Sequence, residues 1–179
     1  MDQTVNTPPV IRLADYRPPA YLIPSVDLSF DIRDDATTVT ARLALTRNPA
    51  AADSAAPLVL DGDELKLESV RLDGRLLAAS EYRIEPERLT IPNVPERFVL
   101  ETVCSVDPAA NTKLMGLYAS KTGFFTQCEA EGFRRITWFI DRPDVMARYT
   151  TTVRADYPVL LSNGNLVASG PGWARFEDP

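Results

Sequence analysis

Residues 116–144 contain the side chains whose types and spacing best suit ligand binding. Gln127, Glu129 and Glu131 occupy alternate positions in this segment. The aromatic residues of the same segment are Tyr118, Phe124, Phe125, Phe133, Trp138 and Phe139. If residues 126–131 are extended, the three polar side chains project to one face, because successive side chains of a strand point to opposite faces. A carboxylate and an amide oxygen beside apolar rings can bind a primary ammonium, since charge and low local polarity both favour it.

Other interpretations of the same residues stay open. Glu129 and Glu131 could be solvated acids, or they could pair with Arg134 and Arg135 in a structural cluster, because ion-pair networks are common. The two glutamates could also be the acid and nucleophile of a glycosidase. Neighbouring alternate residues of one strand rarely face each other across a sugar ring, so we do not favour that reading.

The absence of histidine from the 179 residues excludes several chemistries within this chain. A Ser-His-Asp nucleophile, a His-Glu-x-x-His zinc site and an imidazole acid or base all require one. The 19 basic and 25 acidic residues give a net charge of −6, which argues against nucleic-acid binding. The chain shows neither a signal peptide nor an apolar run long enough to cross a membrane. We therefore predict a cytoplasmic protein without a membrane partner.

Two further features carry a structural interpretation. Cys104 and Cys128 are too few for a disulfide framework and match no zinc-ribbon spacing, which favours a reducing compartment. Cys104 continues an apolar alternation, so we expect a buried thiol. Residues 61–64 (DGDE) resemble half of a calcium loop but lack the distal glutamate of an EF-hand, and we interpret them as an acidic turn.

Alternating apolar and polar residues predict the elements that position these side chains. The turns expected between them are residues 34–36, Asp73-Gly74 and Asn163-Gly164, the last two as hairpins. Fifteen prolines leave no room for a long helix. The predicted strands are 26–32, 39–45, 65–72, 76–77, 82–84, 89–91, 98–106, 136–140, 149–155, 159–161 and 166–168. The expected fold is all-β, with two packed sheets or one strongly curved sheet. We predict an N-terminal tail over residues 1–11 and a single β domain over residues 12–179.

The string TQCEAEG at residues 126–132, followed by FRRITWFIDRPDV, closely resembles the N-terminal domain of bacterial aminopeptidase N, a zinc-dependent alanyl aminopeptidase. The resemblance covers most of the chain beyond the predicted tail. Further matching strings are DYRPP at 15–19, LKL at 65–67, VPERF at 94–98, PAANT at 108–112, GLY at 116–118 and YPVLLSNGN at 157–165.

This resemblance implies a saddle-like domain of mostly antiparallel strands that packs over a separate catalytic domain of the same polypeptide. It implies peptide substrates, whose free α-ammonium would be bound by Glu129 with Gln127 beside it. Arg134, Arg135 and Asp141 would be structural or interfacial. The family's zinc ligands and its Gly-Ala-Met-Glu-Asn segment are absent from this sequence. The resemblance therefore places zinc in the full-length enzyme, assigns no metal to this domain, and predicts that the 179 residues alone are inactive.

An interpretation from another functional class also stays open. The chain could be a stand-alone β-sandwich that binds or scaffolds other proteins without enzymatic activity. Tyr118, Phe124, Phe125 and Trp138 would then be core residues or a partner-binding surface, because aromatic side chains more often fill cores than sites.

Overall fold

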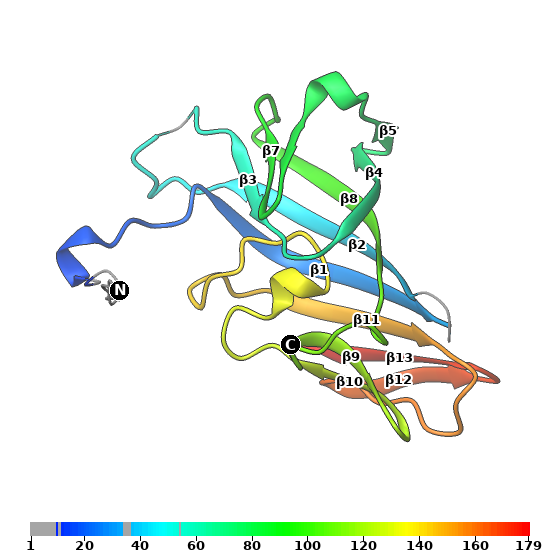
Figure 1. The fold of residues 1–179 in the computed structure, drawn as a ribbon. Coiled ribbons are helices and arrows are strands. Elements are labelled where there is room, and N and C mark those ends of the chain that lie inside the picture. The colour runs from blue at the N-terminus through cyan, green and yellow to red at the C-terminus, as the bar shows by residue number, and fades with distance from the viewer. Residues whose placement is uncertain (1–9, 11, 34–36, 54) are drawn as a thin grey trace, which may run out of the picture.

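The computed structural model describes residues 10, 12–33, 37–53 and 55–179 (Figure 1). Apart from Val10, the predicted tail lies outside these residues, as does the predicted turn at 34–36, so the division at residue 11 stays a prediction. The short 3-10 helices are η1 (Leu13–Asp15), η2 (Ala79–Glu81) and η3 (Phe133–Arg135). The strands are β1 (Tyr21–Ile32), β2 (Thr37–Arg47), β3 (Leu58–Asp61), β4 (Lys66–Leu72), β5 (Arg75–Leu76), β6 (Arg83–Glu85), β7 (Arg88–Ile91), β8 (Arg97–Val106), β9 (Gly116–Ser120), β10 (Gly123–Gln127), β11 (Arg148–Arg154), β12 (Asn165–Gly170) and β13 (Trp173–Asp178).

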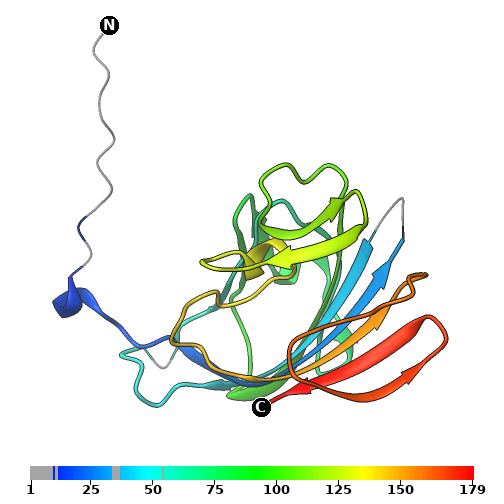
Figure 2. The ribbon, with the colours of Figure 1, turned by 90° about the horizontal axis from the view of Figure 1, so that it is seen from below.

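An eight-stranded sheet is the framework of the molecule, in the order β12-β13-β11-β1-β2-β8-β4-β5. Its strands pair antiparallel except for β1 and β11, which run parallel. Figure 2 shows that this sheet is strongly curved, with β9, β10 and η3 lying over its concave side. Smaller sheets are formed by β9 with β10 and by β3, β7 and β6. The all-β prediction is confirmed, and no helix in the described part of the chain could span a membrane.

Alternating side chains hold the large sheet in place. In β2, Val39, Ala41 and Leu43 are fully buried, while Thr38, just before Val39, and Arg42, between Ala41 and Leu43, are exposed. Cys104 lies opposite Val39 in β8 and is fully buried, as the alternation predicts. The predicted turn at Asp73-Gly74 is also confirmed, because both residues have positive φ and connect β4 directly to β5. One face of the sheet therefore forms the core.

The strand predicted over residues 136–140 is wrong. Phe139 forms only an isolated bridge to Asp61, and the preceding residues are the 3-10 helix η3. Trp138, Phe139 and Ile140 are all buried in succession. These consecutive apolar residues are buried because the segment is enclosed between the concave side of the sheet and the 61–64 turn. A segment enclosed in this way can be buried without forming a strand.

The hairpin predicted at Asn163-Gly164 is also wrong. Residues 159–161 form no strand, and β12 instead pairs with the following strand, β13. Gly164 has a φ of +81°, and a side chain there would collide with the carbonyl of Glu177. The glycine therefore serves a close approach to β13 rather than a two-residue turn. The alternation pattern did not predict β3, β9, β10 or β13.

Candidate functional site

The β9–β10 hairpin carries the first part of the candidate site. Gln127 is the last residue of β10 and pairs with Gly116 of β9, while Phe125 pairs with Tyr118. Phe125 and Gln127 are two positions apart in the strand, so their side chains leave the same face. The rings of Phe125 and Tyr118 stack with their centroids 6.1 Å apart, and Phe125 is 46 % exposed. The hairpin thus presents an aromatic pair beside Gln127.

Residues 128–132 form a turn, so the condition that residues 126–131 are extended is not met. The Gly132 N–H donates to the Cys128 carbonyl at 2.8 Å, which folds the chain back on itself. Glu131 has a φ of +63°, and the peptide bond between Glu129 and Ala130 is cis. The alternation that placed three polar side chains on one face is therefore lost. Gln127 and Glu129 still come together, because the Gln127 Nε2 donates to the Glu129 carbonyl at 3.1 Å.

The two glutamates of this turn have different surroundings. Glu131 Oε1 lies 3.5 Å from Arg134 Nη2, so the ion-pair interpretation holds for Glu131. Glu129 is exposed and, among the residues that the structure describes, forms no ion pair. Within the same residues, no donor lies against the side-chain oxygen of Gln127. The Glu129 carboxylate and the Gln127 side-chain oxygen thus belong to two residues that touch at the surface, and neither group has a partner among the described residues.

The aromatic residues divide between core and surface. Trp138 and Phe139 are buried, and Phe133 packs edge-on against Phe139 with ring centroids 4.8 Å apart. Phe124 packs edge-on against Tyr157 with a centroid distance of 5.6 Å. Of the aromatic residues predicted to lie beside the acids, only Tyr118 and Phe125 remain as candidates. Only the strand register shows that these two residues pair with each other on the hairpin.

Ion pairs fasten the segment that follows the turn. Arg134 donates to Asp141 through Nε at 2.9 Å and through its backbone N–H at 3.1 Å, both to Oδ2. Arg135 is buried and donates to the carboxylates of Asp63 and Glu64. Lys113 Nζ also lies 2.7 Å from Glu64, and the pKa of Glu64 is lowered by Lys113 first and Arg135 second.

The acidic turn at residues 61–64 thus binds cations of the chain itself. Local sequence patterns could not predict this role, because Lys113 and Arg135, the partners of the acidic turn, are distant from it in the sequence. Across residues 10, 12–33, 37–53 and 55–179, no group of three or more histidine, cysteine, aspartate or glutamate side chains is arranged to hold a metal. Burial and the nearby Asp141 raise the pKa of Cys128 to about 11, so this thiol is protonated at neutral pH.

Comparison with known proteins identifies this fold and its sequence pattern. Residues 18–177 match the family model of the peptidase M1 N-terminal domain. The chain belongs to this family. This M1 N-terminal domain is 52 % identical over 181 residues to the aminopeptidase N of Caulobacter vibrioides, an alignment covering 97 % of the chain and 21 % of that relative. The resemblance on residues 126–145 therefore led to the correct family.

Solved structures agree with this placement. The Legionella pneumophila aminopeptidase A in complex with aspartic acid superposes with a TM-score of 0.86 at 34 % identity, covering 94 % of the domain and 21 % of that chain. An M1 zinc metallopeptidase of Deinococcus radiodurans bound to a Tyr-Ser-Ala substrate shares the fold, with a TM-score of 0.67 at 15 % identity, covering 88 % of the domain and 38 % of that chain. The M1 N-terminal domain spans about a fifth of the length of the first two relatives.

Proposed function

We propose that this M1 N-terminal domain anchors the free α-ammonium of a peptide substrate within a zinc aminopeptidase. Glu129 supplies the negative charge, and the side-chain oxygen of Gln127 accepts a second hydrogen bond. The observation that carries the proposal is that Glu129 is exposed and forms no ion pair among the described residues, whereas Glu131 binds Arg134. A carboxylate beside an amide oxygen suits a primary ammonium, which has three donors and a full charge.

Anchoring the ammonium determines which bond is cleaved. A substrate held by its N-terminus at a fixed point presents its first peptide bond at a constant distance from that point. Cleavage of a bond further along the peptide would require the α-ammonium to leave its charge-assisted contact. Glu129 and Gln127 would thus make the enzyme an exopeptidase without taking part in bond cleavage.

The zinc of the proposed enzyme would be held outside this chain. The M1 N-terminal domain has no histidine, and its described residues present no group of ligands that fits a metal ion. When bound, zinc would supply an activated water and polarise the peptide carbonyl. The first partner of this domain would accordingly be the remainder of the same polypeptide. The cytoplasmic location stays a prediction.

The stand-alone binding module receives no support from the comparisons, since the relatives named above are peptidases several times longer than this chain. We therefore do not pursue it as a second function.

Replacement of Glu129 tests the proposal in the full-length enzyme. Glu129→Gln should lower kcat/KM for alanyl-4-nitroanilide, because one charge-assisted contact is lost. The expected loss of transition-state stabilisation is about 2–4 kcal/mol. The matched control is Glu131→Gln, which alters a neighbouring glutamate that Arg134 already binds. The control should retain most of the activity, and zinc content should be unchanged in both variants. Unchanged kcat/KM in Glu129→Gln would contradict the proposal.

A further inference from the structure

Arg135 is a buried cation that joins separate segments of the chain. Only 7 % of its side chain is exposed. Its guanidinium donates to Asp63 and to Glu64, and its Nε donates to the Met115 carbonyl at 3.2 Å. A buried guanidinium without these partners would be a charge that has lost its contacts with water and gained none in return. Arg135 therefore needs these contacts in order to stay buried.

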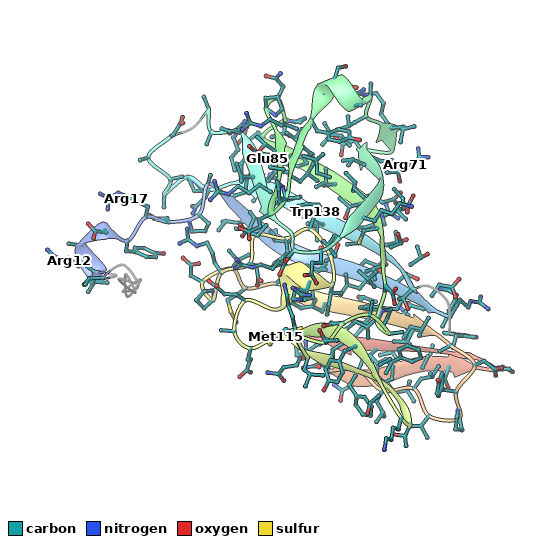
Figure 3. All side chains as sticks on the ribbon, viewed as in Figure 1. Arg12, Arg17, Arg71, Glu85, Met115 and Trp138 are labelled. Atoms are coloured by element: carbon teal, nitrogen blue, oxygen red, sulfur yellow. The ribbon has the colours of Figure 1, made fainter. Side chains whose placement is uncertain are left out.

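The turn that carries Glu129 meets Arg135 directly at Gly132 and, at its other end, through Gly116 of β9. On the β10 side, Gln127 pairs with Gly116, where an added Cβ would lie 2.6 Å from the Arg135 Cβ. On the other side, the Arg135 N–H donates to the Gly132 carbonyl at 3.1 Å. Figure 3 shows Met115 at this junction, where the start of β9 meets η3. A displacement of Arg135 would therefore move both ends of the turn.

The carboxylates that hold Arg135 belong to a firmly attached segment. Asp61, the last residue of β3, exchanges backbone hydrogen bonds with Phe139 at 2.7 and 3.0 Å. The Asp63 N–H donates to the Arg134 carbonyl at 2.9 Å. Gly62 lies directly against the ring of Trp138, which leaves no space for a side chain. The 61–64 turn thus has a fixed position relative to η3.

We infer that Arg135 is a positioning residue for the substrate-binding turn, held in place by Asp63 and Glu64. The inference rests on the proposed function of Glu129 and Gln127. Arg135 is buried, and its direct contact with the turn is a backbone hydrogen bond to Gly132, so it acts through the backbone of residues 127–132. A shift of about 1 Å in a binding group can lower a rate by about 100-fold, so a contact distant from the substrate can control its binding.

A double-mutant cycle in the full-length enzyme tests this coupling. Asp63→Asn should lower kcat/KM for alanyl-4-nitroanilide by about 5- to 20-fold, because Arg135 loses one charged partner and the turn loosens. In the Glu129→Gln background the same change should lower kcat/KM by less than about 2-fold, since the contact between the Glu129 carboxylate and the substrate ammonium is already absent. Equal fold-changes in both backgrounds would overturn the inference and indicate a general structural effect.

Hydrogen exchange of the full-length enzyme provides a readout that does not depend on activity. Asp63→Asn should speed exchange in peptides covering residues 128–135, while peptides from β1, β2 and β8 should be unchanged. The matched control is Asp144→Asn, whose carboxylate is 28 % exposed and pairs with Arg142, compared with 31 % for Asp63. The control should leave both exchange and kcat/KM unchanged.

The outcomes separate this inference from the proposed function. If Asp63→Asn does not fold, the milder Glu64→Gln, at a carboxylate that is 55 % exposed, replaces it in both experiments. Unchanged exchange over residues 128–135 would overturn the positioning role. Faster exchange in Asp63→Asn, together with unchanged kcat/KM in Glu129→Gln, would overturn both the substrate contact and the coupling to it. Arg135 would then have a structural role only.

Discussion

The large sheet and residues 115–141, which contain the proposed ammonium site, depend to different degrees on directional contacts. In β2, the positions of Val39, Ala41 and Leu43 follow from burial of apolar side chains, which is non-directional and shared among many neighbours. Residues 115–141 also bury apolar side chains, such as Trp138, but in addition they are fixed by directional contacts, those of Arg134 with Asp141 and of Arg135 with Asp63. Changes in the sheet should therefore alter global stability, whereas changes in this segment should alter local order and binding.

The largest expected effect is on the sheet. Leu43→Ala should lower the free energy of unfolding of the chain by about 2–5 kcal/mol, because it leaves a cavity at a fully buried position. The control is Thr38→Ala on the exposed face of the same strand, which should change this free energy by less than about 0.5 kcal/mol. Denaturant unfolding measures both. Similar losses in the two variants would mean that burial does not distinguish the faces of β2.

A smaller effect is expected in the segment that follows the turn at residues 128–132. Asp141→Asn should cost about 1–3 kcal/mol of unfolding free energy, because Arg134 loses a charged acceptor whose side chain is only 13 % exposed. Glu131→Gln removes another carboxylate from the same arginine, at a side chain that is 67 % exposed, and should cost about 0–1 kcal/mol. Thermal unfolding of both variants would contradict this ranking if Glu131→Gln were the more destabilising.

The two thiols allow the finest comparison of the regions. Burial raises the pKa of Cys104 to about 12 and that of Cys128 to about 11, so both are protonated at neutral pH and should react slowly with maleimide. Since only the thiolate reacts, both rates should rise with pH. Cys128 should react first, through local opening of its turn, while Cys104 should require unfolding of the sheet.

Labelling followed by mass spectrometry, with Cys104→Ala and Cys128→Ala as single-thiol variants, assigns each rate to its residue. A rate for Cys104 equal to that of Cys128 would show that the sheet and the turn open together. It would thereby contradict the separation of the molecule into a globally held sheet and a locally held segment.

Sequence patterns predicted the sheet better than the segment over its concave side. Alternation identified β1, β2, β8 and β11, because a strand buried on one face must alternate. It failed for residues 136–140, where burial on all sides removes the alternation, and for Asn163-Gly164, where glycine serves a close approach instead of a hairpin. Gln127 ends β10 and Glu129 lies in the turn that follows, where a hydrogen bond joins the two residues, so they do not lie on one extended strand.

The sequence by itself determined the all-β class, the family and the choice of Gln127 and Glu129. These depend on local order along the chain: the period of apolar residues and the string at residues 126–132. Only the tertiary structure decided which glutamate is paired and which is free, and how Arg135 meets Asp63 and Glu64. The contacts of Arg135 with Asp63 and Glu64 join residues about 70 positions apart, whose approach depends on the folding of the intervening strands and so leaves no trace in local spacing.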